Sequence, residues 1–420
     1  MKRIFVCIDG TQNASEIVPK GRWKRAWHRP RGLSASEAEV GRRPTNVLLL
    51  TRALGRHDSN GCSQVVHYVR GVGTDDSAGG AGRIFASAIG RGLSQIVQDA
   101  YVFLTNNYVL SDKVYVLGFS RGAAAARSLS GLTELIGVLP KSLMDQFPIV
   151  WDYYNTPLAE RAAKLDVIRH EEPHLASIIY TGDGYRQEHE EECNNYDGNN
   201  PHPGPRPREE REPLRGNAED SGYVAMPLHF VGVWDTVLAA HREGYHEQRL
   251  AWNVGCARQA LAIHELRGDF TPQLWERKCP HQNVIQTWFP GSHSDIGGGN
   301  GNVKRSALTL RWMIGQLKAH SPEIQFDSTY CTIVGWADRN SRLEFEHRKA
   351  PWITKRWSAR YMGGTWRGES LQFRSSFNDL NPALDHLAQE PEESRQKLSE
   401  ATKRSLLLTP DQSEDNSWYI

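Results

Sequence analysis

A serine, an aspartate and a histidine each lie shortly after an apolar run of this chain, and together they could carry out nucleophilic catalysis. They are Ser120, Asp235 and His293. A serine hydroxyl is a weak nucleophile, and a neighbouring imidazole can take its proton near neutral pH and later return it to a leaving group. A carboxylate fixes the tautomer of that imidazole and stabilises its transient positive charge. These residue types therefore predict a nucleophile, a base and an acid that orients the base.

The serine stands in the pattern Gly-x-Ser-x-Gly at 118–122, between the apolar run 113–117 and the small residues 123–126. A strand, a sharp turn with serine at its tip and the start of a helix make up a nucleophile elbow. The glycines permit close backbone approaches that a Cβ would obstruct. The helix start offers free N–H groups where negative charge would develop. The order serine, aspartate, histidine along the chain is that of α/β-hydrolases.

Each of the three residues also has a purely structural interpretation. Ser120 could cap the helix that follows it, and Asp235 could cap the next segment. His293 could bind the glycine-rich turn 297–299. Asp295 is the second candidate for the acid, but it lies only two residues from the histidine. We therefore rank it below Asp235 and expect it to stabilise the glycine-rich loop.

Backbone N–H groups near the serine would hold the negative charge on an attacked carbonyl oxygen. The residue after the nucleophile, Arg121, supplies one by rule, and we expect the second from Gly10 or Thr11 at the end of the first strand. Asp9 precedes them without a cluster of metal-ligand spacing. We predict no metal and no cofactor, and we leave open whether Asp9 or Asp295 binds a metal.

Strands and helices alternate over the first 320 residues, which predicts an α/β fold with a mostly parallel sheet covered by helices on both faces. The carboxyl ends of parallel strands meet at one edge, so the three candidate residues should converge there. The expected strands are 2–8, 65–69, 113–117, 228–233 and 284–289. The expected helices are 45–54, 84–107, the segment from the elbow to 136, 161–169, 257–266 and 308–317.

The domain organisation follows from where this alternation ends. Residues 1–320 are predicted to form an α/β-hydrolase catalytic domain with a polar surface insertion at about 186–219. Residues 321–420 are predicted to be a C-terminal extension that packs on this domain, with a peripheral tail.

Composition narrows the class of protein. A formal net charge of +1 over 420 residues argues against nucleic acid as a partner. Six scattered cysteines without Cys-x-x-Cys spacing indicate reduced thiols and no zinc site. The first apolar stretch ends at Asp9 and is too short for a signal peptide, and we see no apolar run of about 18 residues. We expect a cytoplasmic protein in the producing cell, with any export through a route independent of cleavable signals.

Five motifs occur in one order and together resemble a known family: 5–13, 68–74, 118–123, 230–237 and 288–299. The chain resembles, over about residues 1–320, the catalytic domain of type VI secretion lipase effectors, an α/β-hydrolase family long catalogued as a domain of unknown function. The resemblance implies that Ser120, Asp235 and His293 form the catalytic triad. It also implies a phospholipase delivered into rival bacteria, with the secretion apparatus and an immunity protein as partners.

Two stretches, 20–31 and 352–361, interleave tryptophan with basic residues, a composition typical of lipid contact. Indole rings favour the headgroup layer, and each basic side chain near anionic lipid gains about 1 kcal/mol. The alternative is a solvated basic loop whose tryptophans pack on the domain. The candidate membrane contacts are Trp23, Lys24, Arg25 and Trp27.

These observations predict a serine esterase or lipase that cleaves acyl esters of phospholipids through an acyl-enzyme, at a membrane surface. The alternatives are an esterase or thioesterase for soluble substrates, and a non-catalytic module that binds a membrane or a partner. Arg121 and Arg127, just after the nucleophile, are expected to pair with structural carboxylates, although Arg121 could attract a phosphate.

Overall fold

The computed structural model describes residues 1–10, 44–71, 83–194, 223–237, 249–262, 265, 270, 272–275, 282–289, 291–299 and 303–327, with the backbone alone at 83–91, 188–194 and 303–305. Several predicted features lie outside these ranges. They are Thr11, the candidate membrane contacts Trp23, Lys24, Arg25 and Trp27, the basic aromatic stretch 352–361, most of the polar insertion, and the extension beyond residue 327.

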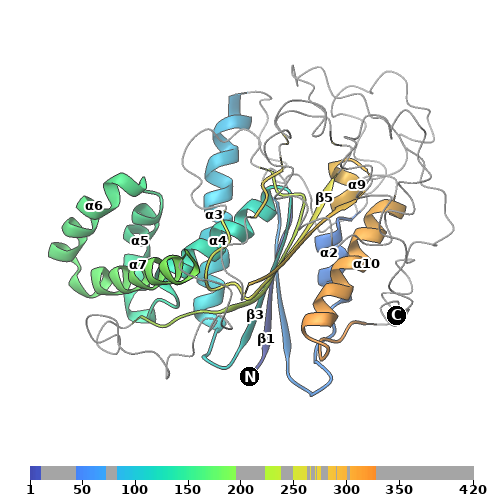
Figure 1. The fold of residues 1–420 in the computed structure, drawn as a ribbon, viewed down its shortest axis with the longest axis horizontal. Helices are drawn as coiled ribbons and strands as arrows, with labels where there is room; N and C mark the ends of the chain where they lie inside the picture. The colour runs from blue at the N-terminus through green and yellow to red at the C-terminus, as the bar shows by residue number, and fades with distance from the viewer. Residues whose placement is uncertain are drawn as a thin grey trace.

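A parallel sheet of six strands forms the centre of the described structure (Figure 1), in the order β2-β1-β3-β4-β5-β6. Each strand runs parallel to its neighbours, so the carboxyl ends of all the strands lie at the same edge of the sheet. This confirms the predicted α/β architecture. The strands are β1 (Arg3–Ile8), β2 (Gln64–Val69), β3 (Lys113–Phe119), β4 (Leu228–Trp234), β5 (Cys256–Ala262) and β6 (Asn283–Phe289).

Helices cover both faces of this sheet (Figure 1). On one side lie α3 (Arg83–Asn107) and α4 (Arg121–Ile136), and on the other lie α2 (Asn46–Ala53) and α10 (Val303–His320). The inner strand β1, which lies between β2 and β3, explains why, because its side chains alternate between two apolar cores. Ile4, Val6 and Ile8 pack in one, and Phe5 and Cys7 pack in the other.

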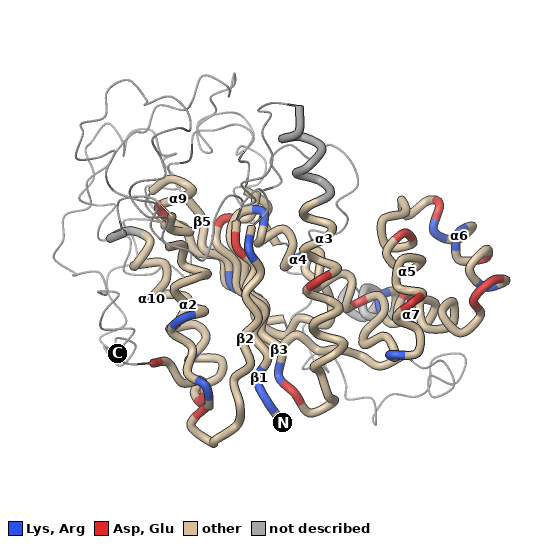
Figure 2. Tube along the Cα trace, turned by 180° about the vertical axis from the view of Figure 1, so that it is seen from behind, with Lys and Arg blue, Asp and Glu red and all other residues tan. Residues whose placement is uncertain are grey.

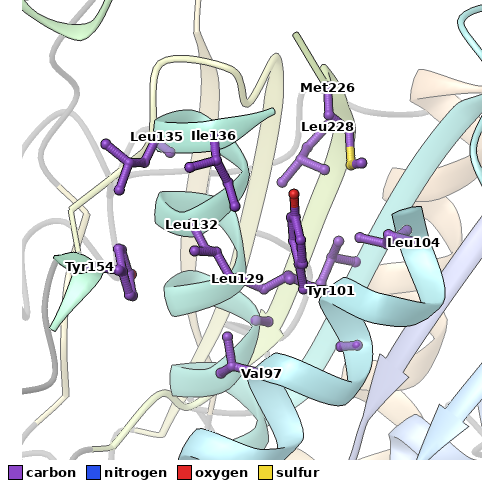
Figure 3. Close-up of a cluster of buried hydrophobic side chains, with 14 of the residues drawn as sticks. Val97, Tyr101, Leu104, Leu129, Leu132, Leu135, Ile136, Tyr154, Met226 and Leu228 are labelled. Carbon is purple, nitrogen blue, oxygen red and sulfur yellow. The ribbon is translucent and has the colours of Figure 1, made fainter. Parts of the chain in front are cut away.

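The core on the α3–α4 side is drawn in Figure 3. Val97, Tyr101 and Leu104 of α3 face Leu129 and Leu132 of α4 across the gap between the helices. These side chains recur at a spacing of three or four residues, as expected for the buried stripe of a helix. This packing holds α4, the helix that directly follows the nucleophile elbow, against α3.

The chain between α4 and β4 forms a helical lobe, which extends to one side of the sheet (Figure 1). It comprises η2 (Lys141–Gln146), α5 (Phe147–Tyr154), α6 (Leu158–Glu171) and α7 (Pro173–Asn194). Acidic and basic residues both occur along α6 (Figure 2), whose exposed surface is charged with both signs. The helix α7 extends to Asn194 and so includes the first residues of the predicted polar insertion at about 186–219.

One predicted helix is a strand. Residues 257–266 were expected to be helical, and alanine, leucine and glutamine do favour helices. Instead β5 runs from Cys256 to Ala262 and is buried along its whole length. A fully buried strand lacks polar alternation, so periodicity cannot separate it from a buried helix. Its polar members find partners: Arg258 donates to Gln316 Oε1 at 2.6 Å and to the carbonyl of Asn283 at 2.8 Å.

The amino edge of the sheet holds a buried polar network, which we call the amino-edge cluster: Arg3, Asp58, Tyr115 and Ser321. Arg3 donates to Asp58 Oδ2 at 2.8 Å and to the Tyr115 hydroxyl at 2.9 Å, and that hydroxyl lies 2.9 Å from Ser321 Oγ. Next to it, residues 323–327 bond to the chain before β2, for example from the Gly55 N–H to the carbonyl of Gln325 at 2.8 Å.

No helix in the described part is long and apolar enough to span a bilayer.

Candidate active site

The structure brings the three candidate residues together at the carboxyl edge of the sheet. Ser120 Oγ lies 2.8 Å from His293 Nε2, and His293 Nδ1 lies 2.7 Å from Asp235 Oδ2. Ser120 is 8% exposed, His293 5% and Asp235 0%. An ionised carboxylate can only accept, so Nδ1 of the neutral imidazole carries the proton and Nε2 can accept from the serine hydroxyl. This tautomer is the one a general base requires.

Ser120 occupies the tip of a strained turn between β3 and α4. Its φ of 59° and ψ of −121° are rarely adopted by residues other than glycine. The flanking glycines are required by space, because a Cβ at Gly118 would lie 2.4 Å from the carbonyl oxygen of Gly122. A Cβ at Gly122 would lie 2.3 Å from the carbonyl oxygen of Ile8. Ser120 makes no side-chain cap to α4, so its structural interpretation as a helix cap was wrong.

Asp235 follows β4 and is aimed at the imidazole by the neighbouring strand β5. Its N–H donates to the carbonyl of Ala260 at 2.7 Å, and its Oδ1 accepts the N–H of Ala262 at 3.0 Å. Oδ2 is left to face His293. Asp235 has a φ of 43°, so this backbone is also held in the left-handed region.

His293 is the first residue of the short helix α9 (His293–Gly297), and two aromatic rings flank its imidazole. The centroid of the Phe119 ring lies 4.7 Å away, and the Phe270 ring approaches edge-on at 4.9 Å. A Cβ at Gly297 would lie 2.0 Å from the Phe119 ring, so this glycine lets α9 approach the elbow strand. The rings restrict the imidazole to the plane that serves both hydrogen bonds.

Two further polar residues hold α9 in place, and neither was recognised from the sequence. The carboxylate of Glu265, 3% exposed, accepts the backbone N–H of His293 at 3.2 Å. At the other end, the amide of Asn46 in α2 donates to the carbonyl of Ile296 at 2.9 Å. In the sequence, Glu265 could have been noticed only as a polar residue soon after a strand. It was overlooked because the segment 257–266 was predicted to be a helix.

Asp295, the second candidate for the acid, performs a structural task. Its Oδ2 accepts the N–H of Ser292 at 2.9 Å and the Ser292 hydroxyl at 3.0 Å. This is the capping box that begins α9. Nδ1 of His293 faces Asp235 instead.

The predicted oxyanion donors have different surroundings. Arg121 is the first residue of α4, so its backbone N–H has no acceptor within the helix. The N–H of Gly10 donates to Asp9 Oδ1 at 2.7 Å, so in this arrangement it is directed at a carboxylate. Thr11, the other candidate, lies outside the described residues. Of the two candidates that the structure describes, Arg121 and Gly10, only Arg121 therefore offers a backbone N–H at the elbow.

Asp9 is surrounded by hydrogen-bond donors from the protein. Its Oδ2 accepts from Thr45 Oγ1 at 2.6 Å and from the Tyr68 hydroxyl at 2.7 Å. Burial, and then the nearby Asp9 carboxylate, raise the pKa of Tyr68, so the phenol stays protonated and donates. Within the described ranges no three His, Cys, Asp or Glu side chains gather as a metal site would require.

Arg127, on α4, supports the wall of the site beside Asp235. It donates to the carbonyls of Gln273 at 2.6 Å and Leu274 at 3.3 Å, and its guanidinium lies 4.7 Å from the centre of the Trp275 ring. Gln273 in turn donates its N–H to the carbonyl of Thr236, next to the acid. Burial lowers the pKa of Arg127 to about 9, so it remains protonated at neutral pH.

A family model described as "T6SS, Phospholipase effector Tle1-like, catalytic domain" matches residues 2–316. The chain belongs to this family. This confirms the resemblance inferred from the five motifs, and the Tle1-like match includes all three residues of the hydrogen-bonded chain.

Other relatives of this Tle1-like chain are more distant. The uncharacterized protein YEL023C of Saccharomyces cerevisiae is 31% identical over 122 residues, which are 26% of this chain and 18% of the yeast protein. The solved structure of the Tle1 effector bound to the VgrG spike of the Type 6 secretion system is 18% identical, with a TM-score of 0.34 over 72% of this chain and 51% of that one. An uncharacterized protein from Pseudomonas aeruginosa is 15% identical, with a TM-score of 0.38 over 80% and 48%.

The chain thus spans about half the length of those two solved structures and a smaller part of the yeast protein. At such TM-scores the likenesses support no conclusion about the site.

Proposed function

We propose that this Tle1-like chain is a serine hydrolase that cleaves the acyl esters of phospholipids. The observation that carries the proposal is the continuous chain Ser120–His293–Asp235, with links of 2.8 Å and 2.7 Å. Membership of a phospholipase effector family favours a lipid ester over other acyl compounds. The strained serine at the elbow supports the same assignment, because strain of this kind is concentrated at functional sites.

The proposed reaction has two halves. Ser120 Oγ attacks the ester carbonyl carbon while His293 Nε2 takes its proton, and Asp235 stabilises the resulting imidazolium. The backbone N–H of Arg121 holds the oxyanion, together with a second donor. The tetrahedral intermediate collapses, the carbon–oxygen bond to the lysolipid breaks, and His293 returns the proton to that leaving oxygen. Water, deprotonated by the same imidazole, then attacks the acyl-serine ester and releases a fatty acid and free Ser120.

The wider role is proposed from family membership. We propose that a type VI secretion system exports the protein into a target cell, with the secretion apparatus and an immunity protein as partners. Residues 1–320 would carry the catalytic machinery, and the extension would pack on it. The membrane contacts at Trp23, Lys24, Arg25 and Trp27 stay a prediction.

The decisive experiment replaces the nucleophile. Ser120→Ala should lower fatty-acid release from phospholipid vesicles by at least about a thousandfold, because no other group at the elbow can form the acyl-enzyme. Wild-type protein should be labelled by a fluorophosphonate, and Ser120→Ala should not. Ser63→Ala is the matched control, since Ser63 is exposed beside β2 and should keep full activity and labelling.

The alternatives give different results in the same assays. Cleavage of short soluble esters without any release from vesicles would indicate a soluble esterase or thioesterase. Wild-type protein that is neither labelled nor active would favour a module that only binds a membrane or a partner. Persistent hydrolysis by a folded Ser120→Ala protein would contradict the assignment of the nucleophile.

A further inference from the structure

The side chain of Arg121 stands out among the arginines of the described structure. It is half-buried, yet it makes no hydrogen bond or ion pair with any residue that the structure describes. Buried arginines elsewhere do have partners: Arg3 bonds to Asp58, Arg161 to the carbonyls of Tyr154 and Thr156, and Arg258 to Gln316. The expected ion pair of Arg121 with a structural carboxylate was therefore wrong within the described chain.

The carboxylates at this edge of the sheet are engaged elsewhere. Asp9 accepts from Gly10, Thr45 and Tyr68, and Asp235 accepts from Ala262 and faces His293. Glu265 accepts the N–H of His293. No described acid therefore neutralises the guanidinium.

The cost of leaving this cation unpaired points to a ligand. Burial lowers the pKa of Arg121 to about 10, so the group is partly desolvated and still protonated at neutral pH. A desolvated charge is unfavourable unless an opposite charge compensates it. Arg121 directly follows Ser120 in the chain, so their Cα atoms are about 3.8 Å apart. A ligand bound at Ser120 could therefore supply the negative charge that compensates the Arg121 guanidinium.

We infer that the Arg121 side chain binds the phosphate of the phospholipid and so makes the site select phospholipids over neutral glycerides. In a glycerophospholipid only the glycerol carbons separate the phosphate from the acyl esters, so a lipid with its ester at Ser120 would hold its phosphate within reach of a long side chain on the next residue. A planar guanidinium suits the bidentate binding of phosphate oxygens. The inference rests on the proposed phospholipase function and adds that the site recognises the substrate by its phosphate.

The test compares two lipids in one assay. Full-length protein is given phosphatidylglycerol or diacylglycerol with identical acyl chains, in micelles of a neutral detergent, and fatty-acid release gives kcat/KM for each. Arg121→Gln should lower the ratio of kcat/KM for phospholipid to that for diacylglycerol by about tenfold to a hundredfold, because a charge-assisted contact is lost. Arg121→Lys keeps the charge without the planar fork and should lower the ratio less.

Two controls keep the test interpretable. Arg169→Gln, at an exposed position on α6, removes the same charge and should leave the ratio at its wild-type value. Arg121→Met keeps an unbranched side chain without the charge, and it replaces the glutamine variant if thermal unfolding shows that variant to be unfolded.

The outcomes separate this inference from the proposed function. Wild-type protein that hydrolyses both lipids, with variant ratios within about twofold of wild type, would overturn the role of Arg121 alone. Wild-type protein that releases no fatty acid from either lipid would overturn the proposed function and this inference with it.

Discussion

At the scale of single residues, backbone strain coincides with the candidate chemistry. Among the described residues other than glycine, positive φ occurs at Ser120 and Asp235. Each such conformation costs on the order of 1–3 kcal/mol and persists only where surrounding contacts hold it. Here the contacts are the hydrogen bonds of Ser120 and Asp235 to β4 and β5. These contacts thus offset the strain at both ends of the hydrogen-bonded chain Ser120–His293–Asp235.

Glu265 gives a test of how the base is positioned. Glu265→Ala removes the acceptor of the His293 N–H, so α9 should shift and kcat should fall by about tenfold or more. Glu265→Gln keeps an acceptor and should recover most of that loss. Initial rates on one ester substrate, with circular dichroism to check folding, measure both effects. An alanine variant with full kcat would show that α9 needs no support from this carboxylate.

The sequence was sufficient for the residues that motifs mark and insufficient for those that only packing selects. The convergence of Ser120, Asp235 and His293 could be predicted because each follows a strand of a parallel sheet. Glu265 and Phe270 could not, because their roles depend on where segments distant in sequence come to lie against the imidazole.

At the scale of elements, the helix propensity of the residues in β5 disagrees with the buried strand that they form. Its residues favour a helix in isolation, but pairing with β4 and β6 on both sides outweighs a preference of less than about 1 kcal/mol per residue. The other predicted strands and helices were confirmed with small shifts at their ends, since their apolar periodicity was clear. The lobe helices α5 and α7 were not predicted. Their buried residues do recur at a spacing of three or four, but α5 has only eight residues and the buried stripe among the described side chains of α7 covers only 175–182.

Two glycines of α7 provide a matched pair for the contact between the lobe and α4. A Cβ at Gly182 would lie 1.7 Å from the carbonyl oxygen of Leu135, whereas nothing lies within 4 Å of one at Gly184. Gly182→Ala should lower the free energy of unfolding by about 1–3 kcal/mol or more, through overpacking. Gly184→Ala should raise it by up to about 1 kcal/mol, through helix propensity.

Urea unfolding monitored by circular dichroism measures both glycine variants under one set of conditions. Equal effects of the two substitutions would contradict the close approach of α7 to α4.

At the scale of the whole molecule, half-buried histidines make stability depend on pH. Burial, then the positive charge of Lys113, lower the pKa of His229 to about 4, and burial also lowers the pKa of His67. These groups stay neutral in the folded chain while their unfolded counterparts take up protons below about pH 6.5. The unfolded state then binds more protons, so stability falls as pH drops from about 6.5 towards 4.

The measurement is the free energy of unfolding in urea at several pH values between 7.5 and 4.5. A histidine that stays neutral in the folded chain contributes at most about 1.4 kcal/mol per pH unit to the slope, and less where water screens it as at these half-buried positions, so His229→Gln should make the dependence shallower. A variant with the wild-type slope would show that His229 titrates normally in the folded protein.

The amino-edge cluster sets a lower limit on the length of chain that can fold as a unit. The family match ends at residue 316, yet Ser321 is bonded to Tyr115, and the backbone of 323–327 joins the segment before β2. A protein shortened at that match boundary would open the amino end of β3 to water and leave the guanidinium of Arg3 with fewer acceptors. Recombinant versions of this domain should therefore retain residues through Asp327.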